Sequence, residues 1–77
     1  MSQKFNLTEI QMDVLRRTAQ GKFNADFASR AEQEAEMQLI EMASQYEEEH
    51  DLIDERMDYT ENCSLLVWFH DKVIMTQ

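Results

Sequence analysis

The chain contains no proline and only one glycine, Gly21, in 77 residues, and this shortage of helix-breaking and turn-forming residues most constrains its fold. A β-rich fold needs such residues at many of its turns, so the composition favours helices. The apolar segment at residues 65–76 allows an alternative of two short strands around a turn at residues 70–72. Because that turn lacks glycine, a helix is favoured there as well. We therefore predict an all-α fold.

The first predicted helix covers about residues 7–20. Asn6 is the expected N-cap, and Glu9 stands three residues later, where the glutamate of a capping box is found. Gly21 follows the helix at a position that favours a left-handed backbone conformation. These signals predict a helix with defined ends.

The second predicted helix is long and covers about residues 25–57. It begins after Asn24, a residue type that often caps helices, and it contains neither proline nor glycine. Three adjacent glutamates at residues 47–49 repel one another, so fraying or a bend is expected there. A third helix over about residues 62–75 completes a single domain, 1–77, of two or three helices with a long acidic central helix.

The small size of the chain favours association. A domain of this length buries only about 60% of its unfolded surface, and Cys63 is the only cysteine, so no disulfide within the chain adds stability. We therefore predict a helical homodimer. The first seven residues lack the apolar run of a signal peptide, and no apolar stretch approaches the ~20 residues that cross a bilayer. A cytoplasmic protein with no membrane contact is expected.

The negative charge of the chain is concentrated in its middle. Residues 31–62 hold twelve carboxylates and one base, Arg56, whereas residues 1–30 carry a small net positive charge, and the whole chain carries −9. An acidic helix repels nucleic acid and attracts basic surfaces. We therefore predict a protein partner with a basic surface and no direct nucleic-acid contact. The predicted partner-binding carboxylates are Glu32, Glu36, Glu47, Glu48, Glu49, Asp51, Asp54, Glu55 and Asp58.

A solvated helix face is the alternative explanation of this charge. Such a face normally mixes acidic and basic residues, because opposite charges four residues apart stabilise a helix. A bias of twelve carboxylates to one base goes beyond that pattern, and the repulsion that it causes lowers the stability of a small domain. The bias therefore favours a binding role.

A second candidate surface is the apolar C-terminal segment. Its residue types are those that dominate protein interfaces, and the same types also fill cores. In a small dimer the interface can be the core, so both interpretations stay open. The predicted partner-binding or dimer residues are Leu65, Leu66, Trp68, Phe69 and Val73.

No pattern of residues indicates catalysis or a cofactor. Glu47 and His50 have the spacing of a carboxylate–histidine pair in helical di-iron bundles, but the sequence around them is among the most polar of the chain. Cys63 and His70 are two helical turns apart, which is too far for a hydrogen bond between a nucleophile and its base. We predict a non-enzymatic protein with no metal and no cofactor.

Four short sequence words near the N-terminus form a pattern: Leu7-Thr8, Val14-Leu15, Ala19-x-Gly21 and Asn24-x-x-Phe27-Ala28. Their order and spacing resemble the opening of a LuxR-type helix-turn-helix domain over residues 7–30. The part of that domain that contacts DNA is not matched, because residues 31–36 carry acids where the recognition helix would follow. The resemblance therefore implies a helical start without DNA binding.

Three functions are compatible with these features. The first is a small acidic inhibitor that blocks a basic surface in place of nucleic acid, in the manner of the anti-restriction, anti-CRISPR and antitoxin proteins of phages and other mobile elements. The second is a regulatory module that binds a transcription regulator through an apolar helix face. The third is a helix-turn-helix DNA binder. The charge distribution favours the first function.

Overall fold

A computed structural model describes residues 5–59 and 64–76 of the chain. These two ranges contain four α-helices and no strand, so the predicted all-α fold is confirmed. The elements in chain order are α1 (Glu9–Ala19), the short 3₁₀ turn η1 (Ala25–Phe27), α2 (Arg30–Glu49), α3 (Ile53–Tyr59), α4 (Leu65–Trp68) and the π-helical segment η2 (Phe69–Ile74), which continues α4.

The C-terminal segment is helical, as the sequence favours, and the alternative of two strands is wrong. Its helix runs from Leu65 to Ile74, within the predicted range of 62–75. Ser64 occupies the N-cap position, and its side chain makes no capping hydrogen bond. Residues 62 and 63, where the helix was predicted to begin, lie outside the described residues.

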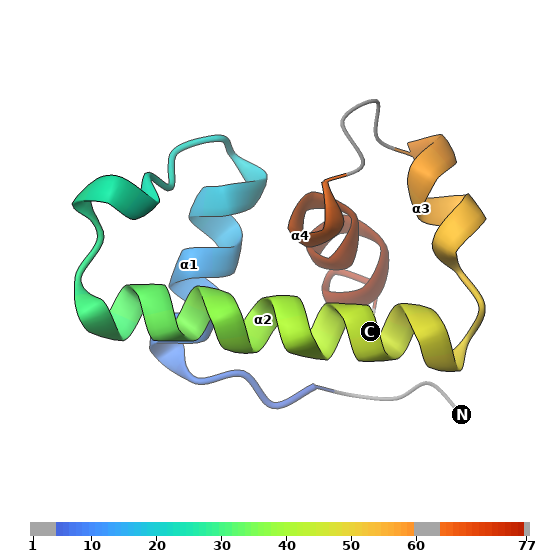
Figure 1. The fold of residues 1–77 in the computed structure, drawn as a ribbon, viewed down its shortest axis with the longest axis horizontal. Coiled ribbons are helices and arrows are strands. Elements are labelled where there is room, and N and C mark those ends of the chain that lie inside the picture. Colours follow the sequence, from blue (N-terminus) through green and yellow to red (C-terminus); the bar gives the residue numbers. More distant parts are fainter. Residues whose placement is uncertain (1–4, 60–63, 77) are drawn as a thin grey trace.

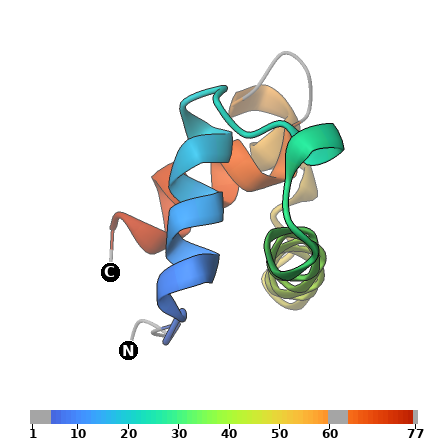
Figure 2. The same ribbon diagram turned by 90° about the vertical axis from the view of Figure 1, so that its left-hand side faces the viewer.

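The helices are arranged around α2, which is the longest element and lies along the longest axis of the molecule (Figure 1). Helices α1 and α4 pack against the same side of α2, and α3 contacts α4 near the C-terminal end of α2. Figure 2 shows α2 end-on, with α1 crossing its direction steeply. This arrangement covers one face of α2 and leaves the opposite face exposed to solvent along its length.

The core lies between α1, α2 and the C-terminal helix. Small side chains on α2, Ala35 and Ala43, are buried and allow the neighbouring helices to approach closely. The ring of Phe69 packs edge-on against the ring of Phe5, with 5.2 Å between the ring centroids. The buried apolar residues are Val14, Leu15, Ala35, Leu39, Ala43, Leu66, Trp68, Phe69 and Val73.

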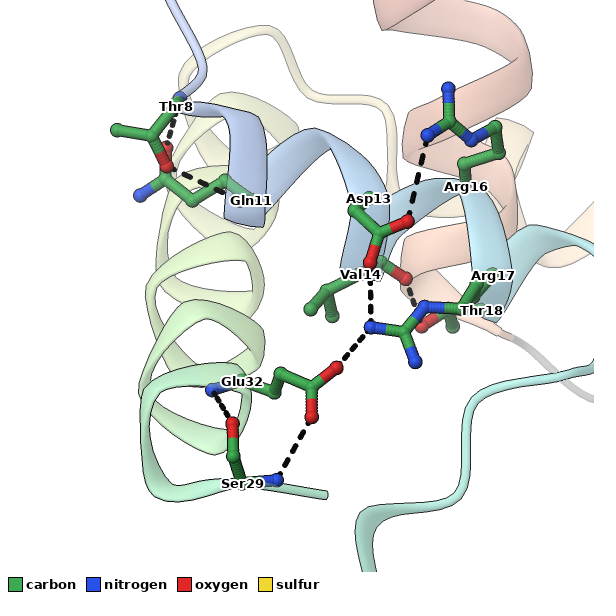
Figure 3. Close-up of polar contacts among 9 residues, drawn as sticks. All are labelled: Thr8, Gln11, Asp13, Val14, Arg16, Arg17, Thr18, Ser29 and Glu32. Carbon is green, nitrogen blue, oxygen red and sulfur yellow. Dashed lines mark hydrogen bonds and ion pairs between the residues drawn. The ribbon is translucent and has the colours of Figure 1, made fainter. Parts of the chain in front are cut away.

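Helix α1 begins two residues later than predicted, because Thr8 and not Asn6 is its N-cap. The Gln11 N–H donates to Thr8 Oγ1 at 3.2 Å, and the Thr8 N–H donates to Gln11 Oε1 at 3.0 Å, which completes a capping box (Figure 3). The predicted end of the helix is correct. Gly21 has a φ of 72°, and the Lys22 N–H donates to the Arg17 carbonyl at 2.8 Å.

The long helix predicted over residues 25–57 is wrong at its start. Asn24 caps only η1, where its side chain accepts a hydrogen bond from the Asp26 N–H. Helix α2 begins after Ser29, whose hydroxyl accepts a hydrogen bond from the Glu32 N–H at 3.2 Å. The Ser29 N–H donates in turn to the Glu32 carboxylate. A second capping box, with two reciprocal hydrogen bonds where Asn24 makes one, therefore sets the start of the helix.

The same long helix also ends earlier than predicted, in a turn at Asp51 that separates α2 from α3. Asp51 has a φ of 53°, and its N–H donates to the Glu48 carbonyl at 3.3 Å. The Leu52 N–H donates to the Glu47 carbonyl at 3.0 Å, so the turn is a Schellman motif with aspartate at the left-handed position. Aspartate is one of the few residues other than glycine that adopt this conformation readily. Of the two outcomes expected near residues 47–49, the bend is therefore found, as a defined turn directly after them, and the frayed helix is not.

Candidate protein-binding surface

The exposed face of α2 carries carboxylates at a regular interval. Glu34, Glu41 and Glu48 follow one another seven residues apart, and all three are exposed. Seven residues are close to two helical turns, so these side chains form one row with a spacing of about 10 Å. Glu34 forms an exposed ion pair with Arg30 at 3.5 Å.

Further exposed carboxylates extend from the end of α2 onto α3. With the row on α2 they form what we call the acidic surface. Most of its members belong to the predicted set, and Glu34 and Glu41 are additions. Apart from Glu34, its members form no ion pair with any residue that the structure describes. The acidic surface consists of Glu34, Glu41, Glu48, Glu49, Asp51, Asp54, Glu55 and Asp58.

The predicted partner-binding role of Glu47 is wrong, because this residue is buried, with 6% of its surface exposed. Its carboxylate accepts hydrogen bonds from the guanidinium of Arg56, from Nε and from Nη2. Arg56 is on α3, and its side chain is only 16% exposed. Glu47 and Arg56 therefore connect the end of α2 to α3 inside the molecule.

Glu32 was also predicted to bind a partner, and here too the structure gives a different role. Its carboxylate accepts a hydrogen bond from the guanidinium of Arg17 on α1 and another from the Ser29 N–H at 2.9 Å (Figure 3). Arg17 also pairs with Asp13 at 2.7 Å. Glu32 thus caps α2 and ties it to α1. Glu36 is half-buried, so it lies at the margin of the exposed face.

The hydrogen bond from Arg17, together with that from the Ser29 N–H, lowers the pKa of Glu32 from 4.5 to about 2. A carboxyl group with a lowered folded-state pKa stabilises the fold fully above its unfolded pKa, and this contribution is lost as the pH falls to the folded pKa. For Glu32 the loss occurs between about pH 4.5 and pH 2. Acid unfolding in this interval therefore depends in part on Glu32.

Replacing Glu32 with glutamine is expected to reduce the loss of stability between about pH 4.5 and pH 2. The comparison needs urea unfolding of the wild type and of Glu32→Gln at several pH values, from neutral to about 2. Glu34→Gln is the matched control, because Glu34 lies on the same helix and is exposed. Parallel stability profiles of the wild type and Glu32→Gln would contradict the role of this carboxylate.

The apolar residues predicted as a partner or dimer surface belong to the core of the monomer. Leu66, Trp68, Phe69 and Val73 are each at most 6% exposed, and Leu65 is half-buried. The four buried side chains face α1 and α2, so another protein cannot reach them without unfolding this one, and Leu65 packs at the margin of the core. The interpretation of these residues as a binding surface is therefore corrected, and their interpretation as the core is confirmed.

Within the described ranges, no three His, Cys, Asp or Glu side chains are grouped as metal ligands would be. The spacing of Glu47 and His50 does not produce such a site, since Glu47 pairs with Arg56 and the His50 ring packs against the ring of Tyr46, with 4.4 Å between centroids. Cys63, considered with His70 as a reactive pair, lies outside the described residues.

A small polar cluster connects α3 to η2. The Tyr59 hydroxyl donates to Asp71 at 2.5 Å, and His70 Nδ1 lies 2.7 Å from the other carboxylate oxygen of Asp71. The hydrogen bond from Tyr59, followed by that from His70, lowers the pKa of Asp71, and the pKa of Tyr59 is raised by the same contact. Lys72 lies over the Tyr59 ring at 4.8 Å. These contacts fix α3 against the C-terminal helix.

Sequence reasoning missed the exposed apolar side chains of α2. Met37 is 68% exposed and Ile40 is 43% exposed, and they lie beside the row of glutamates. The signal that reveals this face is the seven-residue repeat of Glu34, Glu41 and Glu48, which is visible in the sequence once the extent of α2 is known.

No described helix has both the length and the apolar character needed to cross a membrane. The sequence matches no protein-family model, no curated protein and no solved structure. The resemblance of residues 7–30 to a LuxR-type domain therefore stays a prediction, carried by residues that form α1, the turn at Gly21 and η1.

Proposed function

We propose that this protein is a non-enzymatic inhibitor that binds a basic surface of a partner protein through its acidic surface, in place of nucleic acid. The observation that supports this most is the set of exposed carboxylates of the acidic surface, of which only Glu34 has an ion-pair partner among the described residues. Partners of the expected kind are nucleases, nucleic-acid-guided complexes and transcription factors. Inhibitors of anti-CRISPR or anti-restriction type fit this description, and the proposed location is the cytoplasm.

The net charge of the whole molecule also favours a basic protein over nucleic acid as the partner. A net charge of −9 on a chain of 77 residues attracts a basic protein at long range and accelerates its association. The same charge opposes contact with DNA or RNA, because phosphates would meet carboxylates. Direct binding of nucleic acid, as in a helix-turn-helix protein, is therefore not proposed.

The construction of α2 supports the proposal as well. A capping box at Ser29 fixes its start, and a Schellman turn at Asp51 fixes its end. The Glu47–Arg56 pair then holds α3 beside the end of α2. The exposed carboxylates are therefore held on a defined scaffold before binding, which limits the entropy lost on association.

The test is capture of proteins from a cell lysate on the immobilised protein, followed by elution with duplex DNA or with neutral dextran at equal ionic strength. Nucleic-acid-binding proteins are expected to elute with DNA and not with dextran. The variant Glu41→Gln/Glu48→Gln is expected to bind these proteins roughly tenfold more weakly at low salt, because it removes two charges from the acidic surface.

The matched control is Glu9→Gln/Asp26→Asn, which changes the net charge equally but lies on α1 and η1, where the side chains are also exposed. This variant is expected to bind much like the wild type. Equal weakening by the two double variants would mean that total charge and not the acidic surface governs binding. Elution that does not respond to DNA would contradict the proposed competition with nucleic acid.

A further inference from the structure

The exposed face of α2 carries a second row of side chains next to the row of glutamates, and the two in its centre are apolar. Met37 and Ile40 are exposed. Gln33 and Ser44, about one helical turn away at either end, are exposed on the same side of the helix. These four positions are separated by four, three and four residues, which is the spacing of the a and d positions of a heptad repeat. We call these four positions the seam. Because the core lies on the opposite side of α2, around Leu39, the seam takes no part in the packing of the core.

The glutamates have a fixed relation to this seam. With Met37 and Ser44 at a positions and Gln33 and Ile40 at d positions, each member of the row of glutamates falls at an e position. Residues at e and g flank the seam and form the interhelical ion pairs that select a partner. Glu36 occupies a g position on the other side of the seam. The other g residue, Ala43, is buried in the core, so the seam has a row of carboxylates along its e edge and a single one, Glu36, at its g edge.

The turn η1 is attached to the N-terminal end of the seam. Gln33 Nε2 donates to the Ala25 carbonyl at 3.0 Å and to the Ala28 carbonyl at 3.5 Å. Phe27, in the same turn, is 88% exposed, the largest exposed fraction among the large apolar side chains of the described residues. The turn that carries this exposed aromatic ring is therefore held at the first position of the seam.

We propose that this seam of α2 binds an amphipathic helix of the partner, one whose apolar stripe is flanked by lysine and arginine. The proposal rests on the proposed function and specifies the part of the basic surface that is recognised. Charge complementarity selects this occupant, because carboxylates at e and g positions pair with bases at the facing positions of the other helix. A second copy of α2 would bring glutamates against glutamates, so the predicted homodimer is not expected to use this seam.

The test uses two synthetic peptides of three heptads with identical composition, measured by fluorescence anisotropy at equal ionic strength. One has leucine at the a and d positions and lysine or arginine at e and g, and the other has the same residues in scrambled order. The ordered peptide is expected to bind the wild type at least about tenfold more tightly, because only its apolar stripe matches the seam.

The variant Met37→Gln/Ile40→Ser is expected to remove most of that preference for the ordered peptide. Met75→Gln is the matched control, since Met75 is 65% exposed but lies after η2, away from the seam. Circular dichroism of each variant establishes that the helices are retained.

Equal binding of the two peptides, unchanged in Met37→Gln/Ile40→Ser, would overturn the inference and leave the electrostatic function intact. Binding of neither peptide would overturn the inference and would also count against the proposed function. Sedimentation that shows a dimer of the wild type and a monomer of Met37→Gln/Ile40→Ser would overturn it as well, because a second copy would then occupy the seam.

Discussion

Replacing Phe69 with alanine is expected to leave the chain without a cooperative unfolding transition. The Phe69 side chain is completely buried, and its ring contacts the ring of Phe5. Truncating a buried phenylalanine to alanine costs about 3–5 kcal/mol, which is comparable to the whole stability expected of so small a domain. Urea unfolding followed by circular dichroism measures the effect directly.

Phe27→Ala is the matched control for this experiment, because it is the same substitution at a side chain that is 88% exposed. Its effect on the free energy of unfolding is expected to stay within about 0.5 kcal/mol. The pair of variants also separates two interpretations of the C-terminal segment. If Phe69→Ala folded normally and lost only partner binding, residues 65–73 would be an interface and not the core.

The second large effect is expected on breaking the buried ion pair between α2 and α3. Arg56→Met leaves the Glu47 carboxylate in the interior, 6% exposed and without the guanidinium that it contacts. Removing one partner of a buried pair costs about 3–5 kcal/mol, and the partial exposure of Arg56 places this case near 3 kcal/mol. The measurement is again urea unfolding at neutral pH.

The double variant Glu47→Leu/Arg56→Met is the control for this second prediction. It removes both charges and fills the space with apolar side chains, so most of the lost stability is expected to return. A near-wild-type stability of Arg56→Met alone would show that the pair is solvated. In that case Glu47 would be available to a partner, as the sequence suggests.

The sequence predicted the helical class correctly because glycine and proline are scarce along the whole chain, which disfavours the many turns of a β fold. The predicted starts of α1 and α2 and the predicted end of α2 were wrong for a local reason. Two capping boxes and an aspartate in a left-handed turn decide where the helices begin and end, and none of the three uses glycine or proline. Gly21, where glycine does mark a helix end, was predicted correctly.

Apolar residues recur at steps of three or four along much of residues 27–57, which predicts one buried stripe on the long helix, and this stripe matches the structure only in its middle. Ala35 and Leu39 are buried, as the stripe predicts, whereas Phe27 and Met57 are exposed. These two residues lie outside α2, so they do not share its axis, and the extrapolated stripe does not apply to them. The spacing of apolar residues alone does not reveal where a helix ends.

Much of the candidate surface was predictable from charge, but not which carboxylates remain exposed. Glu32 and Glu47 resemble their neighbours in the sequence, yet each pairs with an arginine distant along the chain. Arg56 was counted as the single base in an acidic segment, and in the fold it neutralises one buried carboxylate. Pairing of this kind depends on how α1 and α3 pack against α2, which the residue pattern does not determine.

The most direct test of the central claim is displacement of labelled duplex DNA from a captured nucleic-acid-binding target at increasing salt concentrations. The wild type is expected to displace the DNA with a potency that falls steeply as the salt concentration rises. The reason is that its carboxylates replace DNA phosphates at the same lysine and arginine side chains of the target. Glu41→Gln/Glu48→Gln is expected to be weaker at low salt and less sensitive to salt. Displacement that is unaffected by both salt and these substitutions would contradict an electrostatic imitation of nucleic acid.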